Sequence, residues 1–237
     1  MKYIYGKNAV NNALANNNVS EIYLIDNLKE YRNCKIPVNI ITKAEMTKMT
    51  KTDKHQGVVA IINSYDTITL DKLIKDAANS EYPLLVILDG LKDPHNLGAI
   101  MRSTDAVNAQ GIIYKKHNSV SLNATVAKVS CGAIDAVSVC EVTNIVQTIN
   151  KLKKEGYWIV GSAIGSKDDY RSIDYKRPIA LIVGSEGEGI SRIVSENCDY
   201  LVNLPMKGQV NSLNASVACG ILLYEIDSNR YPHNKWR

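Results

Sequence analysis

The sequence predicts an α/β protein in which a domain with a parallel sheet follows a small N-terminal α/β unit. Three observations support this prediction. In the later part of the chain, apolar runs of five or six residues alternate with helical patterns, which is typical of strands covered on both faces. A polar stretch, residues 65–82, separates this part from residues 1–64. The length of 237 residues also fits one to two domains.

The first unit shows short helical and strand patterns in alternation. Hydrophobic periodicity predicts these elements. The expected helices are Gly6–Ala15 and Lys43–Met49, and the expected strands are Glu21–Ile25, Val38–Ile41 and Val58–Ile62. The polar stretch contains one further helical pattern, Leu70–Ala77, and is interpreted as a linker.

The second part alternates regularly between strand and helix. The expected strands are Leu84–Asp89, Ile112–Tyr114, Trp158–Ala163, Ile179–Gly184 and Tyr200–Leu204. The expected helices are Leu97–Ala109, Ala124–Cys131, Thr143–Glu155, Ile190–Asn197 and Leu213–Ile226. Ligands of open parallel sheets bind at the carboxyl ends of the strands. The loops after Asp89, Gly184 and Leu204 are therefore the places where chemistry is expected.

The first of these loops begins the segment Asp89–Arg102 (DGLKDPHNLGAIMR). Pro94 argues against an early helix start, and Asn96 can cap the helix that follows. Arg102 lies off the apolar stripe of that helix. From the residues alone, purely structural roles, a helix cap at Asn96 and a surface cation at Arg102, are as plausible as functional roles for these two residues. The expected buried face consists of Leu97, Ile100, Met101 and Thr104.

The second loop is the glycine-rich segment Gly184–Gly189 (GSEGEG). Its spacing is G-x-x-G-x-G rather than the dinucleotide pattern G-x-G-x-x-G, and no G-K-[ST] follows. Glu186 and Glu188 would oppose a phosphate at the start of the next helix. The glycines permit close backbone approach or a positive φ. This loop therefore favours a neutral or cationic ligand.

The third loop, Leu204–Asn214 (LPMKGQVNSLN), places polar residues directly before an apolar helix. Ser212 or Asn214 can simply cap that helix. Three polar loops at one sheet edge instead favour a binding site. None of them contains a Ser-His-Asp set, a distinct acid–base carboxylate pair or a metal cluster.

Composition excludes several classes of protein. The longest apolar runs, Leu84–Leu88 and Ile179–Val183, fall far below the roughly 20 residues of a membrane span. The first residues, MKYIYG, lack the apolar core of a signal peptide, so a cytoplasmic protein without a membrane partner is expected. The five cysteines are scattered without a C-x-x-C pair, and the four histidines show no ligand spacing. Buried reduced thiols and no metal are expected.

The net charge of +4 is distributed unevenly. Residues 1–64 contain nine basic and five acidic side chains, whereas the rest of the chain contains equal numbers of both. An excess of positive charge on a small unit fits a solvated lysine-rich surface or a nucleic-acid contact. Charge alone favours the solvated surface.

Three segments together resemble the motifs of the SpoU-type RNA ribose 2′-O-methyltransferases of the SPOUT superfamily. They are DGLKDPHNLGAIMR (Asp89–Arg102), IVGSEGEGI (Ile182–Ile190) and LPMKGQVNSLNASVA (Leu204–Ala218). Three further segments resemble the subgroup that methylates a guanosine of 23S ribosomal RNA, so the resemblance covers nearly the whole chain. These are YGKNAV (Tyr5–Val10), HQGVVA (His55–Ala60) and LNATVAKVSCGA (Leu122–Ala133).

The resemblance implies S-adenosylmethionine as methyl donor, a homodimer, and a C-terminal trefoil knot in the catalytic domain. It divides the chain into an RNA-binding domain (1–64), a linker (65–82) and a methyltransferase domain (83–237). The large-subunit ribosomal RNA is the implied substrate. The implied donor-binding residues are Gly184, Leu204 and Leu213, with Ala163 and Met206 nearby.

The resemblance also implies catalytic roles. A ribose 2′-OH is a weak nucleophile that must be activated. The central residue is Arg102, but a guanidinium is a poor base at neutral pH, so we expect it to polarise the hydroxyl or hold the adjacent phosphate. Asn96 and Asn214 would orient the hydroxyl and Arg102. Glu186 would anchor Arg102 or complement the donor's positive charge, and Ser212 would hydrogen-bond nearby.

RNA selection is assigned to the basic N-terminal unit, with Lys7, Arg32 and Lys54 as candidate phosphate contacts. The same chemistry on transfer RNA is the first alternative. A non-catalytic RNA-binding ribosome-assembly protein is the second, although it would not need all five catalytic candidates. A nucleotide-dependent oxidoreductase is the third, and the acidic loop Gly184–Gly189 counts against it.

Overall fold

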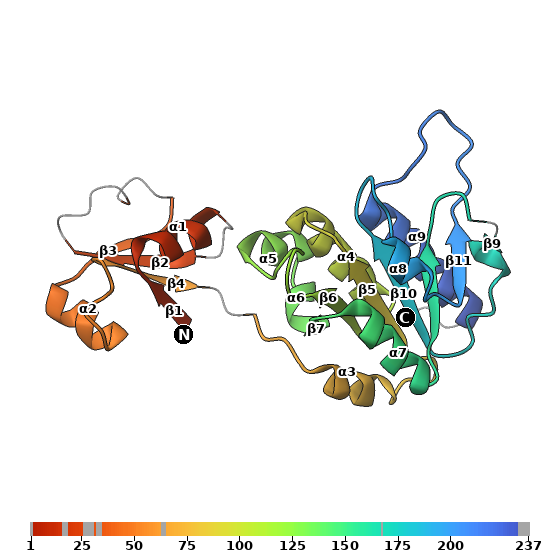
Figure 1. The fold of residues 1–237 in the computed structure, drawn as a ribbon, viewed down its shortest axis with the longest axis horizontal. Coiled ribbons are helices and arrows are strands. Elements are labelled where there is room, and N and C mark those ends of the chain that lie inside the picture. Colours follow the sequence, from red (N-terminus) through yellow and green to blue (C-terminus); the bar gives the residue numbers. More distant parts are fainter. Residues whose placement is uncertain are drawn as a thin grey trace. The chain divides into compact units, whose positions relative to one another are not determined.

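The computed structural model describes residues 2–15, 19–25, 31, 35–62, 65–166 and 168–231. The chain forms two compact units whose main division falls between Tyr65 and Asp66. Each unit has its own sheet and its own hydrophobic core (Figure 1). The two units are therefore described separately.

The first unit is built on a four-stranded sheet with the order β1-β4-β2-β3. Strand β4 is antiparallel to β1 and β2, and β2 is parallel to β3. Helix α1 covers one face, because Val10 is fully buried in a cluster with Ile22 and Ala60 of the sheet. The elements are β1 (Lys2–Tyr5), α1 (Lys7–Ala15), β2 (Val19–Leu24), β3 (Val38–Ile40), α2 (Lys43–Thr50) and β4 (Val58–Ile62).

The second unit contains a seven-stranded sheet with the order β7-β6-β5-β10-β8-β11-β9. All its neighbouring strands run parallel. Its strands are β5 (Leu84–Asp89), β6 (Gly111–Lys115), β7 (Ser138–Val142), β8 (Trp158–Ser162), β9 (Asp168–Asp169), β10 (Ile179–Gly184) and β11 (Tyr200–Asn203). Its helices are α3 (Leu70–Ala77), α4 (Pro94–Ala106), α5 (Ala124–Ser130), α6 (Ala133–Ala136), α7 (Ile145–Lys154), α8 (Arg192–Ser195), α9 (Ala215–Arg230) and the 3-10 helix η2 (Tyr170–Ser172).

Helices cover both faces of this sheet. On one face, Leu85 and Ile182 of the sheet pack with Leu73 of α3 and Ile149 of α7. Helices α4 and α9 pack against each other and against β6 and β10. Burial on both faces explains why β5 and β10 are almost entirely apolar. The predicted fold class is confirmed, and the strand order is consistent with a C-terminal knot.

Helix α4 starts earlier than the sequence suggested. It begins at Pro94 and is capped by Asp93, whose carboxylate accepts the His95 N–H at 2.9 Å. The prediction that Pro94 delays the helix and Asn96 caps it is wrong, because proline in the first turn loses no hydrogen bond there. The predicted buried face is confirmed at Leu97, Ile100, Met101 and Thr104.

Part of the expected linker is packed into the second unit. Leu73 and Ala77 of α3 are fully buried. The N–H of Ile68 donates to the carbonyl of Val139 in β7 at 2.8 Å. Strands β1, β7 and the two-residue β9 were not expected; all three lie at the edges of their sheets and contain polar residues. These short strands lack the continuous apolar signal of the central strands.

A buried arginine holds the last turn of α9. Arg230 donates to four backbone carbonyls at 2.8 to 3.3 Å, which satisfies its guanidinium. Burial lowers the pKa of Arg230 to about 10, so it stays charged at neutral pH. The acceptors belong to Tyr82, Pro83, Tyr175 and Arg177, just before β5 and β10. Arg230 therefore fixes the end of α9 to the starts of two central strands.

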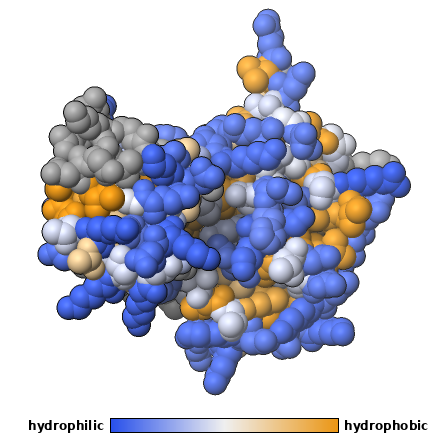
Figure 2. Space-filling model, turned by 60° about the vertical axis from the view of Figure 1, so that its left-hand side comes forward, coloured by the Kyte–Doolittle hydropathy of each residue, from blue (hydrophilic) through white to orange (hydrophobic). Residues whose placement is uncertain are grey.

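The surface mixes hydrophilic and apolar side chains. The face in Figure 2 is largely hydrophilic, with separate apolar patches. Within the described residues, no helix combines the length and the apolar character needed to cross a membrane.

Candidate functional site

The carboxyl ends of four parallel strands meet at one edge of the large sheet. Gly184 at the end of β10 pairs with Asp89 at the end of β5. Next to them, Ser162 of β8 pairs with Val202 of β11. The side chain of Asp89 also accepts the N–H of Ser191 at 2.8 Å, which ties the first loop to the second. The three loops predicted to hold chemistry therefore adjoin each other, together with the loop after β8.

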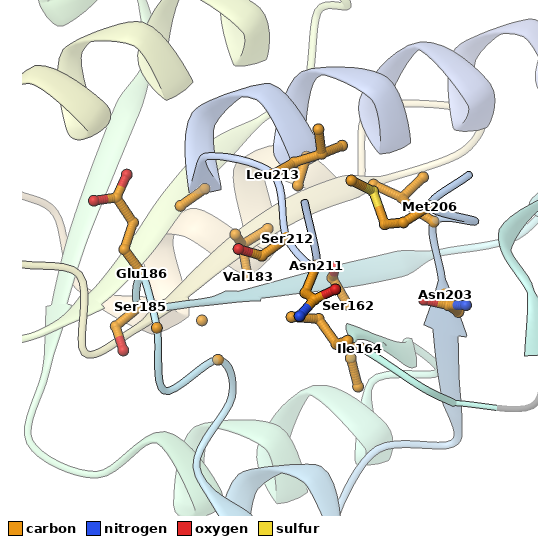
Figure 3. A pocket seen from close by; sticks show the side chains of 17 residues that line it. Ser162, Ile164, Val183, Ser185, Glu186, Asn203, Met206, Asn211, Ser212 and Leu213 are labelled. Atoms are coloured by element: carbon orange, nitrogen blue, oxygen red, sulfur yellow. The ribbon is translucent and has the colours of Figure 1, made fainter. Parts of the chain in front are cut away.

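A cleft of about 640 Å³ opens at this edge (Figure 3). Glu186 lies at one end of the cleft, and Met206 and Asn203 lie at the other (Figure 3). Glu186 and Ser212 line it, as do all five residues predicted to bind a donor. These five are Ala163, Gly184, Leu204, Met206 and Leu213.

The sequence did not single out several other residues of the cleft. Ser162 and Ile164 come from the end of β8, and Asn203 comes from the end of β11. Asn211, by contrast, was part of the polar cluster that the sequence placed in the third loop, and it points into the cleft beside Ser212 (Figure 3). For Ser162, Ile164 and Asn203, the available signal was their position at the carboxyl ends of parallel strands. No residue pattern distinguished them from ordinary strand ends.

The backbone folds tightly at Gly184. A Cβ at this position would overlap the backbone of Gly189 and Ile190. This close approach exists because Ser185 and Gly189 exchange two backbone hydrogen bonds of 3.0 Å, which close the loop. Gly189 has a φ of 68°, a conformation that suits glycine. The glycines therefore let the second loop fold back over the end of β10, rather than cradle a phosphate.

Three side chains distant in the sequence form one hydrogen-bond network beside the cleft. The amide of Asn96 donates to Glu186 Oε1 at 2.9 Å. The amide of Asn214 donates to Asn96 Oδ1 at 2.9 Å and also to Glu186 Oε1. Asn96 is only 4% exposed, so both ends of its amide are satisfied out of water. The network joins the first, second and third loops.

The cap of α9 fixes the direction of this network. Asn214 Oδ1 accepts the backbone N–H of Ser216 at 2.9 Å and the Ser216 hydroxyl at 2.6 Å. Since its oxygen faces the helix, its amide nitrogen must face Asn96 and Glu186. The carboxylate of Glu186 only accepts hydrogen bonds, which orients the amide of Asn96 in turn. Of the two candidate caps, the structure thus selects Asn214, and it leaves Ser212 in the cleft.

A second cavity adjoins the cleft and shares Ser185 and Glu186 with it. Asn96 and Glu186 line it together with Lys92 and Glu188 of the first and second loops. Glu186 lines both cavities. Glu186 therefore belongs to two adjoining spaces at this edge of the sheet.

Arg102 lies apart from both cavities. It is exposed on α4 and is among the lining residues of neither space. Within the described part of the chain, its guanidinium has no hydrogen-bond or ion-pair partner. The structure thus brings together Asn96, Glu186, Ser212 and Asn214 but not Arg102. Its predicted role stays a prediction.

The candidate RNA contacts all belong to the first unit. Lys54 is exposed, and Lys7 is half-buried at the start of α1. Arg32 lies outside the described residues. Nowhere in the described ranges do three His, Cys, Asp or Glu side chains gather as metal ligands would.

The cysteines offer no nucleophile at the site. Burial raises the pKa of Cys140 to about 11 and those of Cys198 and Cys219 to about 12, so these thiols stay protonated at neutral pH. They are free, as is Cys131, which is exposed rather than buried as expected. Cys34 lies outside the described residues.

We expect Gly184→Ala to open the second loop. The added methyl group cannot be accommodated without moving the backbone of Gly189, so we predict a loss of about 1–3 kcal/mol in the free energy of unfolding. The matched control is Gly208→Ala, because a Cβ at Gly208 meets nothing within 4 Å. Urea denaturation of both variants measures the difference. Equal stability of the two would contradict the tight fold at Gly184.

Both units match families of known proteins. The family model described as "SpoU rRNA Methylase family" matches residues 83–224. The model described as "RNA 2'-O ribose methyltransferase substrate binding" matches residues 3–68. YacO of Bacillus subtilis, named for the TrmH family of tRNA/rRNA methyltransferases, is 42% identical over 241 residues, covering 97% of this chain and 96% of that protein.

Solved structures share the fold. An AdoMet-bound rRNA methyltransferase from Sinorhizobium meliloti has a TM-score of 0.63 and 26% identity, covering 94% of this chain and 85% of that chain. A TrmH/SpoU tRNA modifying enzyme from A. aeolicus has a TM-score of 0.59 and 32% identity, covering 68% and 84%. With both units matched and a full-length relative well above 30% identity, the chain belongs to the SpoU/TrmH family of RNA methyltransferases.

Proposed function

We propose that this protein transfers a methyl group from S-adenosylmethionine to a ribose 2′-OH of structured RNA, namely a guanosine of large-subunit (23S-type) ribosomal RNA. The observation that supports this most strongly is that Glu186 lines both cavities and is held by Asn96, which lines the second. A donor in one cavity and a nucleotide in the other would meet across a fixed polar network. The substrate-binding match of the first unit supports RNA as the acceptor.

The first cleft has the chemistry to hold S-adenosylmethionine. Leu204, Met206 and Leu213 offer apolar contacts for a flat base. The carboxylate of Glu186 offers a negative charge at one end of the cleft. The AdoMet-bound rRNA methyltransferase of similar fold supports the same ligand. When bound, the donor supplies an electrophilic methyl group on a positively charged sulfur.

The residues of the network would position the acceptor hydroxyl. Asn96 and Asn214 hold the carboxylate of Glu186 in a fixed orientation through amide N–H groups. A hydroxyl in the second cavity can donate to this carboxylate and so point its lone pair toward the first cleft. Ser212 lies within the first cleft and can hydrogen-bond beside it. Such positioning contributes up to ~7–11 kcal/mol to rate acceleration.

A homodimer would explain the position of Arg102. Helix α9 exposes the apolar side chains of Val217, Ile221 and Tyr224, and α4 packs beside α9. Exposed apolar patches of this kind mark protein interfaces. A second copy docked on this face would bring the partner's Arg102 toward the site, where a guanidinium can hold the phosphate next to the reacting ribose. We also propose that the enzyme acts in the cytoplasm.

The direct test is transfer of labelled methyl groups from S-adenosylmethionine to total ribosomal RNA and to total transfer RNA, followed by mapping of the modified nucleotide. We expect label on one guanosine 2′-OH of the large-subunit RNA. Label confined to transfer RNA would favour the second candidate, which the similarity to the A. aeolicus tRNA modifying enzyme supports. Donor binding without labelling of any RNA would favour a ribosome-assembly protein.

We expect Arg102→Ala to lower methyl transfer by at least about a hundredfold while leaving the affinity for S-adenosylmethionine nearly unchanged. The reason is that Arg102 acts on RNA and lies outside the donor cleft. Arg102→Lys should restore little, because a lysine lacks the planar fork that grips a phosphate. Arg171→Ala, which changes an exposed arginine paired with Asp169, is the control. Full activity of Arg102→Ala would rule out this role.

A further inference from the structure

The first unit has a sheet face that carries aromatic side chains. Strand β4 lies between β1 and β2, and its residue Val59 is the register partner of both Tyr5 in β1 and Tyr23 in β2. Tyr3 pairs with Ile61 on the same face. Helix α1 covers the opposite face, so these tyrosines point away from the core that α1 forms. On the edge strand β1, Tyr3 is 37% and Tyr5 41% exposed.

Exposed lysines lie on the part of helix α2 that contacts Tyr3. The hydroxyl of Tyr3 donates to the carbonyl of Met49, in the last turn of α2. This contact places the end of the helix, with Lys48 and Lys51, beside the Tyr3 ring. Both lysines are exposed. Two exposed lysines therefore lie on the segment that contacts Tyr3.

The loop before β4 brings a further lysine to the other end of β1. The backbone N–H of Lys7 donates to Gln56 Oε1 at 2.8 Å, two residues after Tyr5. The N–H of Gly6 donates to the carbonyl of Val58 at 3.1 Å. The loop that contains Gln56 also contains the exposed Lys54. Lysines therefore lie near both ends of β1, the strand that carries Tyr3 and Tyr5.

Among the described residues of this unit, three carboxylates are hydrogen-bonded by its own polar groups. Glu45 forms a capping box with Thr42, and these hydrogen bonds lower the pKa of its carboxyl group. Asp53 accepts the hydroxyl of Thr47 at 3.0 Å. Glu21 accepts the amide of Asn39. These carboxylates keep their charge, but the lysines of the first unit outnumber them, so the unit carries a net positive charge.

From this arrangement we infer that Tyr3 and Tyr5 form a stacking platform for unpaired bases of the substrate RNA, with Lys48, Lys51 and Lys54 holding the flanking phosphates. The inference rests on the proposed function, because it names the RNA feature that the first unit grips. Bases stack on aromatic rings regardless of sequence, but only where they are not paired. The platform therefore selects a loop or bulge of a folded RNA over a continuous duplex.

The test measures binding of the full-length protein to fluorescein-labelled oligoadenylate strands and to a blunt RNA duplex. We expect Tyr3→Ala and Tyr5→Ala each to weaken single-strand binding by about tenfold and to leave duplex binding unchanged. Tyr5→Phe should bind like the unchanged protein, whereas Tyr5→Leu should resemble Tyr5→Ala. Ile40→Ala, at an exposed apolar residue of the opposite edge strand β3, is the matched control.

The salt dependence of RNA binding distinguishes base stacking on the tyrosines from phosphate contacts of the lysines. The double change Lys48→Ala and Lys51→Ala should reduce the slope of log affinity against log salt by about 0.7 for each lysine, whereas the tyrosine variants should keep the slope. Thermal unfolding of each variant reports whether the first unit is intact. Tyr5→Leu keeps an apolar side chain at the strand edge. A loss of binding in this variant therefore reports the loss of the aromatic ring rather than the loss of folding.

Three results would overturn the platform: single-strand affinity unchanged in Tyr5→Ala, equal binding by Tyr5→Leu and Tyr5→Phe, or no preference of the unchanged protein for single strands. The binding assay does not depend on methyl transfer. A protein that labels ribosomal RNA but binds equally well without Tyr5 would refute the platform alone. A protein that labels no RNA but loses single-strand binding without Tyr5 would refute the proposed function alone.

Discussion

The side chain of Asn214 makes two connections on which the arrangement of the site depends. Its oxygen caps α9 through the N–H of Ser216, and its nitrogen reaches Asn96 and Glu186. Capping alone contributes about 1 kcal/mol, and hydrogen bonds to a carboxylate contribute about 1.5–3 kcal/mol each. Three loops that are far apart along the chain are thereby fixed to the start of one helix.

The parallel sheet makes this connection possible. The pairing of Gly184 with Asp89 puts the first and second loops side by side, and β11 delivers the third loop to the same edge. The bare backbone of Gly184 lets the second loop fold back on itself, which presents Glu186 to both cavities. At the far end, Arg230 fixes α9 to the starts of the central strands. Helix α9 is thus held at both ends by buried or capping polar groups.

Sequence patterns predicted the centre of the fold better than its edges. Strands β5 and β10 were predicted at their observed limits, because burial on both faces demands continuous apolar runs. The edge strands β1 and β7 were missed, since one exposed side admits polar residues. A helix cap was one interpretation of Asn96, and an orienting role was the one that the resemblance implied; Asp93 caps α4 and leaves Asn96 to bond across the loops.

The site could be predicted only where motifs or strand ends gave a signal. All five expected donor contacts line one cleft, whereas Ile164 and Asn203 had no pattern of their own. The second cavity could not be foreseen, because it depends on how two loops pack. The sequence could not predict that Arg102 lines neither cavity of its own chain either, because this depends on how α4 packs in three dimensions.

The most direct test of this account is the methyl-transfer rate of Asn214→Asp. An aspartate caps a helix as well as an asparagine does, but it cannot donate to Asn96 or Glu186. We expect α9 to stay capped, the free energy of unfolding to fall by about 1.5–3 kcal/mol because the hydrogen bond to Glu186 is lost, and the rate of methyl transfer to RNA, measured where the variant is folded, to fall by at least about a hundredfold. A rate close to that of the unchanged protein would contradict the claim that this network aligns the two cavities.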